Sequence, residues 1–250
     1  MPYTPWSVVA FEQPTAAKWN QLGENDAYLK ALALPLENGR WELCSETWTR
    51  TGNHTFTVSG DQTAKYRKGA KLRYKDGSTY EYGTVFSSAY SAPNTTVTLF
   101  TNTDYLMAAT TITDRYISFD ENPEGFPVAF NYALTLTAPG GTVPTFSTVL
   151  AKFSVLNGVI KAWGNLQNTT GGTAGAGAVI LNISLPAAEP YGISLVGNGV
   201  CYSAGVTFLG VLCRASGASF YMHDNGMANV NAASFSNAAR QIHFEINYLF

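Results

Sequence analysis

The distribution of charge along the chain is the feature that most constrains its fold. Residues 1–125 hold 25 charged side chains, whereas residues 126–250 hold only 7. Roughly a quarter of the residues in a soluble domain are charged, so the second half would be poorly solvated as a monomer. A surface this poor in charge is typical of protein that is covered by a partner. The sequence therefore predicts an oligomer in which much of the second half is interface.

The overall composition excludes several classes of protein. Of the 250 residues, 46% are hydrophobic and 13% aromatic, which supports a sizeable core and argues against a disordered chain. The net charge of −2 argues against a general nucleic-acid binder, which is normally basic. No run of about 18 apolar residues is present, and the N-terminus lacks the basic and apolar regions of a signal peptide. We therefore expect neither nucleic-acid binding nor membrane insertion.

The N-terminal arm, residues 1–40, contains the one convincing helical segment of the chain, residues 14–33. The stripe that this helix would present either packs on its own domain or forms one strand of a parallel bundle of several chains, with a polar residue fixing the register. Gly23 and Asn25–Asp26 could divide the segment into two short helices. Four side chains at 3-4-3 spacing form the stripe and are candidates for trimerisation or attachment: Trp19, Leu22, Asp26 and Leu29.

The remainder of the chain predicts two β domains joined by a linker. Residues 41–118 alternate in polarity and contain an Asp76-Gly77 hairpin signal, which favours a small barrel-like domain, with a sandwich as the alternative. Residues 119–126 are acidic and contain proline and glycine, as a linker does. Residues 127–250 predict a jelly-roll-like β-sandwich with a hairpin at Asn157-Gly158. The expected fold class is therefore mainly β with a short N-terminal helix.

The three cysteines do not form a disulfide framework. Cys44, Cys201 and Cys213 are odd in number and lack a CxxC pair. We expect buried free thiols, with a bridge between Cys201 and Cys213 as an alternative if their strands pair.

The sequence offers no catalytic or metal-binding constellation. The three histidines lack a GxSxG elbow or a neighbouring nucleophile, and the second half has too few carboxylates to favour a glycosidase pair. The acidic run Asp120–Glu124 lacks the spacing of a calcium loop, so a solvated linker is the simpler interpretation. We predict no catalytic residues, no metal and no cofactor.

Two groups of side chains are candidates for contacting a partner. The basic run either guards an exposed strand edge or binds an acidic partner or an anionic glycan; it comprises Lys65, Arg67, Lys68, Lys71, Arg73 and Lys75. Aromatic and amide groups near the C-terminal loops suit saccharide contact, although Phe220 and Tyr221 could equally belong to the core. These receptor or glycan candidates are Tyr202, Phe220, Tyr221, His223, Asp224 and Asn225.

Motifs along most of the chain resemble those of tailed-bacteriophage virion appendages, the small tail-fibre, tail-tip and head-fibre proteins. They include Trp-Asn-x-Leu-Gly-x-Asn-Asp from Trp19, Asn-Pro-Glu-Gly-Phe-Pro from Asn122, and Arg-Gln-Ile-His-Phe-Glu-Ile-Asn-Tyr from Arg240. The resemblance implies a homotrimer whose N-terminal part attaches to other virion proteins and whose C-terminal knob faces outward. These motifs are not catalytic, and the resemblance does not specify which appendage this is.

The resemblance leads to an expected function with two alternatives. We expect a non-enzymatic structural protein of the virion, a homotrimeric tail-fibre or tail-tip component whose C-terminal knob contacts a host-surface glycan or protein. The first alternative is a head-fibre or capsid-decoration protein without a receptor role. The second is a glycan-degrading enzyme, which the scarcity of carboxylates in residues 126–250 disfavours.

Overall fold

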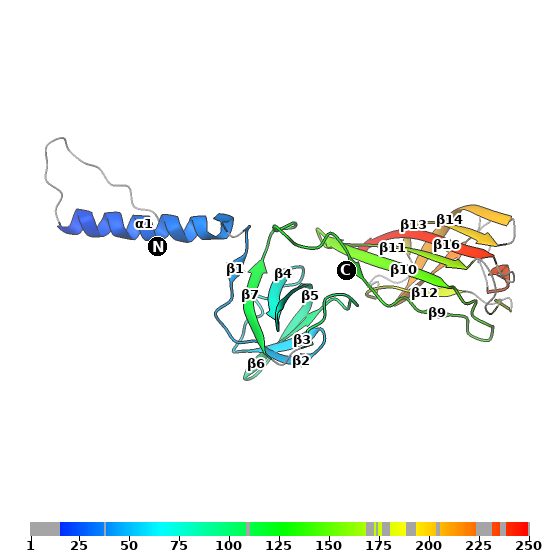
Figure 1. Ribbon diagram of the computed structural model, residues 1–250, viewed down its shortest axis with the longest axis horizontal. Coiled ribbons are helices and arrows are strands. Elements are labelled where there is room, and N and C mark those ends of the chain that lie inside the picture. Colours follow the sequence, from blue (N-terminus) through cyan, green and yellow to red (C-terminus); the bar gives the residue numbers. More distant parts are fainter. Residues whose placement is uncertain are drawn as a thin grey trace.

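The computed structural model describes residues 16–37, 39–108, 111–168, 173, 175–176, 181–188, 194–203, 206–223, 232–235 and 239–249. Over this part of the chain the fold is mainly β, with one N-terminal α-helix and two antiparallel sheets. This confirms the predicted fold class. Figure 1 shows the helix, the first sheet and the second sheet following one another along the long axis of the molecule.

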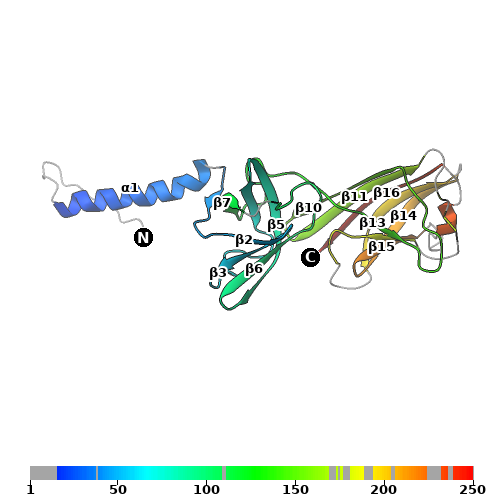
Figure 2. The same cartoon turned by 60° about the horizontal axis from the view of Figure 1, so that its bottom comes forward.

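Helix α1 (Ala16–Glu37) is continuous and extends away from both sheets in Figures 1 and 2. The predicted helix is confirmed and ends four residues later than expected. The alternative of two short helices is wrong. A glycine inside a helix costs only about 1 kcal/mol relative to alanine, and Gly23 lies in open space with no steric reason to break the helix.

The first sheet has seven strands in the order β1-β7-β4-β5-β6-β3-β2. The hairpin predicted at Asp76-Gly77 joins β4 to β5, and Gly77 adopts the positive φ of 62° that such a tight turn requires. The strands are β1 (Glu42–Leu43), β2 (Thr49–Gly52), β3 (Thr55–Ser59), β4 (Lys71–Asp76), β5 (Thr79–Ser91), β6 (Asn94–Leu99) and β7 (Ile112–Ser118).

The two ends of this sheet approach each other without closing into a barrel. A single bridge joins Thr49 to Thr111, but among the described residues no ladder joins β2 to β7. Strand β1 occupies the edge of β7 that would complete the barrel, since Glu42 pairs with Ile117 and Leu43 with Tyr116. The barrel-like expectation is therefore corrected to an open sheet.

The second sheet has nine strands in the order β8-β10-β11-β16-β13-β14-β15-β12-β9. The hairpin predicted at Asn157-Gly158 joins β10 to β11, and both turn residues have positive φ. A short helical turn, η1 (Ala232–Phe235), precedes the last strand. The strands are β8 (Phe130–Asn131), β9 (Leu136–Thr137), β10 (Thr148–Leu156), β11 (Val159–Asn168), β12 (Asn182–Ser184), β13 (Ser194–Ser203), β14 (Val206–Ser216), β15 (Ser219–His223) and β16 (Arg240–Leu249).

This sheet folds over on itself and encloses a core in the manner of a sandwich. Phe220 of β15 and Phe244 of β16 lie 4.8 Å apart between ring centroids, although two strands separate β15 from β16 in the sheet. The hydroxyl of Tyr132, which follows β8, donates to the carbonyl of Ser184 on β12 at 3.3 Å. The predicted sandwich-like character is confirmed, with both layers belonging to one continuous sheet.

Aromatic side chains and one lysine connect the two sheets. The ring centroid of Phe100, which follows β6, lies 5.9 Å from that of Phe153 on β10. The ring centroid of Phe126, in the predicted linker, lies 5.6 Å from that of Phe130 on β8. The ammonium of Lys71 on β4 is buried and donates to the carbonyl of Val155 on β10 at 2.7 Å. Part of the first sheet therefore shares a hydrophobic cluster with the second.

The register of β13 and β14 decides between the alternatives for two of the cysteines. The strands do pair, but Cys201 lies opposite Phe208 and Cys213 lies opposite Gly197. Five residues along β14 span about 17 Å, whereas the two Cα atoms of a disulfide lie within about 7 Å. The Cys201–Cys213 bridge is therefore wrong for this fold. Cys44 is a buried free thiol, as expected.

Candidate functional site

The described residues place the predicted receptor-contacting side chains on several elements. Phe220 is fully buried and packs on Phe244 in the core of the second sheet, so it cannot contact a partner and its candidacy is corrected. Tyr221, the next residue on β15, is half-buried and pairs with Arg214 of β14. Asp224 and Asn225 lie outside the described residues, as do the side chains of Tyr202 and His223.

The backbone register separates Tyr202 from the other candidates. Tyr202 on β13 lies opposite Thr207 of β14, whereas His223 on β15 lies opposite Leu212 of the same strand. Thr207 and Leu212 are five residues apart, which is about 17 Å along a strand. Tyr202 and His223 therefore lie at separate places along the sheet.

The four predicted trimerisation residues form an exposed stripe on α1. Trp19 is 58% exposed, Leu22 39% and Leu29 52%, and Asp26 is exposed on the same face. Large apolar side chains that water reaches to this extent lose the stabilisation that burial would give them. The alternative in which the stripe packs on its own domain is wrong for these four side chains in the single chain.

The basic run does not guard a strand edge. Strand β4 lies in the interior of the first sheet, between β7 and β5, which corrects the edge interpretation. Lys65 forms an ion pair with Glu46 at 2.8 Å, and the guanidinium of Arg73 lies over the ring of Tyr116 at 4.4 Å. These cations have separate local partners, so the run is not one continuous basic surface.

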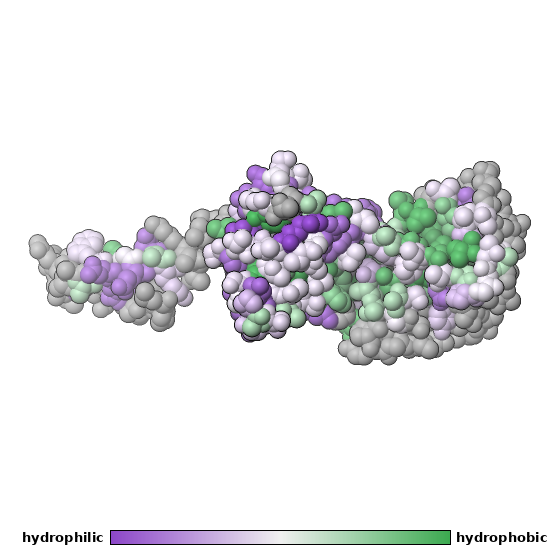
Figure 3. All heavy atoms as spheres, turned by 90° about the horizontal axis from the view of Figure 1, so that it is seen from below, coloured by the Kyte–Doolittle hydropathy of each residue, from purple (hydrophilic) through white to green (hydrophobic). Residues whose placement is uncertain are grey.

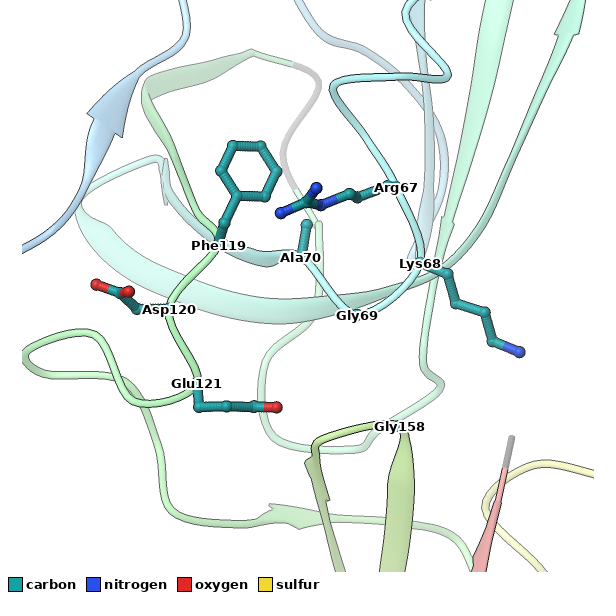
Figure 4. Close-up of a pocket in the computed structure, with 8 residues that line it drawn as sticks. All are labelled: Arg67, Lys68, Gly69, Ala70, Phe119, Asp120, Glu121 and Gly158. Atoms are coloured by element: carbon teal, nitrogen blue, oxygen red, sulfur yellow. The ribbon is translucent and has the colours of Figure 1, made fainter.

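A pocket of about 290 Å³ lies where the first sheet, the predicted linker and the Asn157-Gly158 hairpin meet. Figure 4 shows Arg67 directed toward Phe119, with Asp120 and Glu121 on the linker side. The guanidinium of Arg67 lies 4.4 Å from the Phe119 ring centroid. Asp120 pairs with Arg40 at 3.3 Å, and Glu121 accepts a hydrogen bond from the backbone N–H of Asn157. Asp120 therefore contacts the segment before β1 and Glu121 contacts the hairpin of the second sheet, while both residues remain partly exposed to solvent.

A buried polar cluster lies in the core of the first sheet. The indole N–H of Trp48 donates to the hydroxyl of Tyr66 at 2.7 Å, and this hydroxyl donates to the carboxylate of Glu46. Burial would raise the pKa of Glu46, but hydrogen bonds from Lys65 and Tyr66 outweigh it and hold that pKa below its usual range. Burial raises the pKa of Cys44 beside them. A protonated thiol is a poor nucleophile, so the cluster is suited to holding the core together.

The outer face of the second sheet carries polar side chains that sequence reasoning did not select. On β11 and β16, alternate residues point away from the core and pair across the two strands. Trp163 lies opposite Glu245, and Asn165 lies opposite His243. The amide nitrogen of Gln241 lies 2.6 Å from Nε2 of His243 and 3.4 Å from Oδ1 of Asn165. This arrangement joins an amide, an imidazole and a second amide in one network.

A hollow of about 460 Å³ lies beside this network, between β13 and β16. The registered pairs Asn198–Glu245 and Val200–His243 surround it, and between them lies the pair Gly199–Phe244. Asn198, His243 and Glu245 are exposed and Val200 is half-buried, whereas Gly199 and Phe244 are buried. Successive residues of a strand point to opposite faces, so Phe244 faces the core and the backbone at Gly199 and Phe244 forms the floor of the hollow between the four outward side chains.

A signal for this face was present in the sequence. Along β16 the residues Gln241, His243, Glu245 and Asn247 alternate with apolar ones, and a period of two places all four on one side of a strand. The alternation by itself predicts only a strand with one polar face. The position of the hollow cannot be predicted in this way, because β16 pairs with β13 through residues 37 to 49 positions apart.

Among the described residues, no group of three or more His, Cys, Asp or Glu side chains is arranged to hold a metal ion. Over the same residues, none of the helices has the length and hydropathy needed to span a membrane. Comparison of the chain with protein-family models, with curated proteins and with solved structures finds no match.

Proposed function

We propose that this chain is a non-enzymatic structural protein of a bacteriophage virion, a homotrimeric tail-fibre or tail-tip component. In this proposal α1 joins the three copies and attaches them to other virion proteins. The second sheet faces outward on the virion surface and contacts the host cell. The motifs described above, which resemble those of virion appendages, support the choice of this class.

The exposed stripe on α1 is the observation that carries the proposal. Trp19, Leu22 and Leu29 are between 39% and 58% exposed on a helix that stands clear of both sheets. Their spacing suits the seam of a parallel bundle, in which each stripe is covered by its neighbours. Two heptads alone give a weak bundle, so contacts between the sheets would have to contribute to the assembly.

The surface of the second half supports the same proposal. Figure 3 shows hydrophilic residues gathered on α1 and on the first sheet, while the coloured residues of the second sheet in this view are mostly pale or hydrophobic. Exposed leucines on the second sheet include Leu150 at 57% and Leu249 at 52%. Such a surface suits a chain that is partly covered by its own copies and meets a further partner with the remainder.

The first test is the solution mass of the full chain, measured by light scattering coupled to size exclusion. The proposal predicts a mass near three times 26.9 kDa. Leu22→Asp places a charge in the seam and should shift the population toward monomers, because the charge would be desolvated in the assembled bundle. Asn20→Asp adds the same charge on a different face of α1 and is the matched control. A monomeric wild-type chain would overturn the proposal.

The second test concerns the host contact. Purified full chain added in excess should block adsorption of the particles to host cells, because it would occupy the receptor. A protein that remains on the particle but does not block adsorption would favour the head-fibre or decoration alternative. Release of reducing sugar ends from host glycan would favour the enzyme alternative.

A further inference from the structure

The hollow between β13 and β16 is open to solvent and has the volume of a small-ligand site. Its volume of about 460 Å³ falls within the range of about 300–1,000 Å³ that ligand sites occupy. The pairs Asn198–Glu245 and Val200–His243 are two residues apart on each strand, so they stand about 7 Å apart along the sheet. Four side chains at that separation frame a space the size of one sugar ring.

The side chains that line the hollow are suited to binding a sugar. Asn198 supplies an amide that donates and accepts, His243 supplies an imidazole, and Glu245 supplies acceptor oxygens. Val200 provides an apolar surface between them. A pyranose presents the complementary pattern, with hydroxyl groups around its edge and C–H groups on its face. Trp163, opposite Glu245 on β11 and half-buried, adds an aromatic group for a neighbouring sugar.

The charges around the hollow favour an uncharged ligand. Glu245 forms an ion pair with Lys161 at 2.9 Å, so the nearest carboxylate is neutralised by a cation outside the hollow. Among the residues that line the hollow, Glu245 is the only Asp, Glu, Lys or Arg. A carboxylated or phosphorylated sugar would find no cation in the lining to offset the cost of leaving water.

The imidazole that borders the hollow is held in place by its neighbours. Nε2 of His243 lies 2.6 Å from the amide nitrogen of Gln241, which in turn lies 3.4 Å from Oδ1 of Asn165. Since a side chain fixed before binding loses less conformational entropy on binding, this network lowers the cost of contacting a ligand. The network has no evident role in the core, because all three side chains are on the outer face.

We propose that this hollow binds one uncharged sugar residue of a host-surface glycan. The inference rests on the proposed function for the source of the glycan, and it assigns the contact to Asn198, Val200, His243 and Glu245. This location differs from the loops around Asp224 that the sequence suggested. A trimer would present three such hollows, and simultaneous engagement would raise a weak single-site affinity.

The test is a binding titration of the full chain with four soluble trisaccharides, built from glucose, galactose, mannose and N-acetylglucosamine respectively. Binding is measured by calorimetry and by NMR saturation transfer. We expect at least one of them to bind. His243→Ala and Asn198→Ala should each weaken that binding by about tenfold, because each removes a hydrogen bond to the ligand.

Asn247→Ala is the matched control, since Asn247 is an exposed amide on the same strand and the same face but outside the hollow. It should leave the affinity unchanged, and the melting temperature of all three variants should match that of the parent chain. Binding of none of the four sugars would overturn the inference, as would binding that both hollow variants leave intact. A loss of trimer mass in these variants would instead make the hollow a contact between copies and also overturn it. Failure of the sugar test with a trimeric mass leaves the proposed function standing.

Discussion

The two sheets of this chain enclose cores of different chemistry. In the first sheet, buried aromatic groups are linked by polar ones, since Trp48 donates to Tyr66 and Tyr66 donates to Glu46. In the second sheet the core is a cluster of apolar side chains, beside which the buried guanidinium of Arg240 donates to the carbonyls of Thr145 and Thr173, and Lys161 and Glu245 pair on the outer face. The comparison teaches that the first half uses many of its charges to hold its own fold together. The second half has few charges, and among its described residues only Arg240 is both charged and buried, which leaves a surface suited to a partner.

The largest effect is expected from truncating an aromatic ring that contacts both sheets, which tests whether the two sheets unfold together. Phe153 is fully buried and lies close to Phe100 and Phe130, so Phe153→Ala should cost about 3–5 kcal/mol of stability. Because Phe100 belongs to the first half of the chain, we expect both sheets to unfold at lower urea. The measurement is urea unfolding followed by circular dichroism and by tryptophan fluorescence.

The matched control for this variant is Leu150→Ala on the exposed face of the same strand, which should change stability by less than about 0.5 kcal/mol. If the unfolding of Phe153→Ala separates into two transitions, of which only one lies at lower urea than in the parent chain, the sheets unfold independently and the shared cluster does not couple them.

The next effect concerns the lysine between the two regions. Burial lowers the pKa of Lys71 to about 8, whereas an exposed lysine titrates near pH 10.4. Between these pH values the unfolded chain binds more protons than the folded chain, so stability rises with pH across the window. The rise attributable to Lys71 is on the order of 3 kcal/mol, about 1.4 kcal/mol for each pKa unit.

Urea unfolding between pH 7.5 and 10.5 measures this rise, and Lys71→Met isolates the contribution of the lysine. The methionine variant should lack this part of the pH dependence, since its side chain does not titrate. At pH 7.5 the variant should be at least as stable as the parent chain, because an apolar side chain can replace a buried charge without loss. Identical pH profiles for the two proteins would show that Lys71 is not desolvated at the junction.

Two buried tyrosines of the first sheet test how much the polar network contributes to stability. Tyr66→Phe removes a hydroxyl that bonds to both Trp48 and Glu46 and should cost about 1–3 kcal/mol. Tyr74→Phe removes a buried hydroxyl that has no hydrogen-bond partner among the described residues, and should raise stability by about 1 kcal/mol. Thermal melts of the two variants should therefore shift in opposite directions. A shift in the same direction would contradict the distinction between the linked and the unlinked hydroxyl.

The smallest effect is expected on the outer face of the second sheet. Lys161 and Glu245 have side chains 46% and 56% exposed, and exposed pairs of this kind contribute less than about 1 kcal/mol. Lys161→Ala should change stability by no more than about 0.5 kcal/mol, and by less at high salt. A larger loss in the melting temperature would mean that this face is structural.

The local elements of the fold could be predicted from the sequence, whereas its long-range features could not. The turns at Asp76-Gly77 and Asn157-Gly158 depend on two residues each, and the structure confirms both predictions. The burial of Phe220 depends on Phe244, which becomes its neighbour only because the second sheet folds over on itself. The first sheet stays open instead of closing into a barrel because β1 pairs with β7, and these strands are more than 70 positions apart.

The candidate site shows the same limit. The stripe on α1 could be predicted because four spacings within one helix define it. The hollow beside His243 depends on the register of β13 against β16, which a single sequence does not reveal.

The long strands of the second sheet also determine how the molecule would respond to a pulling force. Figure 1 shows β10, β11, β13 and β16 running close to the long axis of the molecule, with α1 at the opposite end. Hydrogen bonds in an antiparallel ladder are perpendicular to the strands. Tension between the helix and the far end of the second sheet would therefore load the bonds of β10 and β11 in shear, all at once. A ladder loaded in this direction ruptures as a unit, whereas one pulled across its strands would unzip bond by bond.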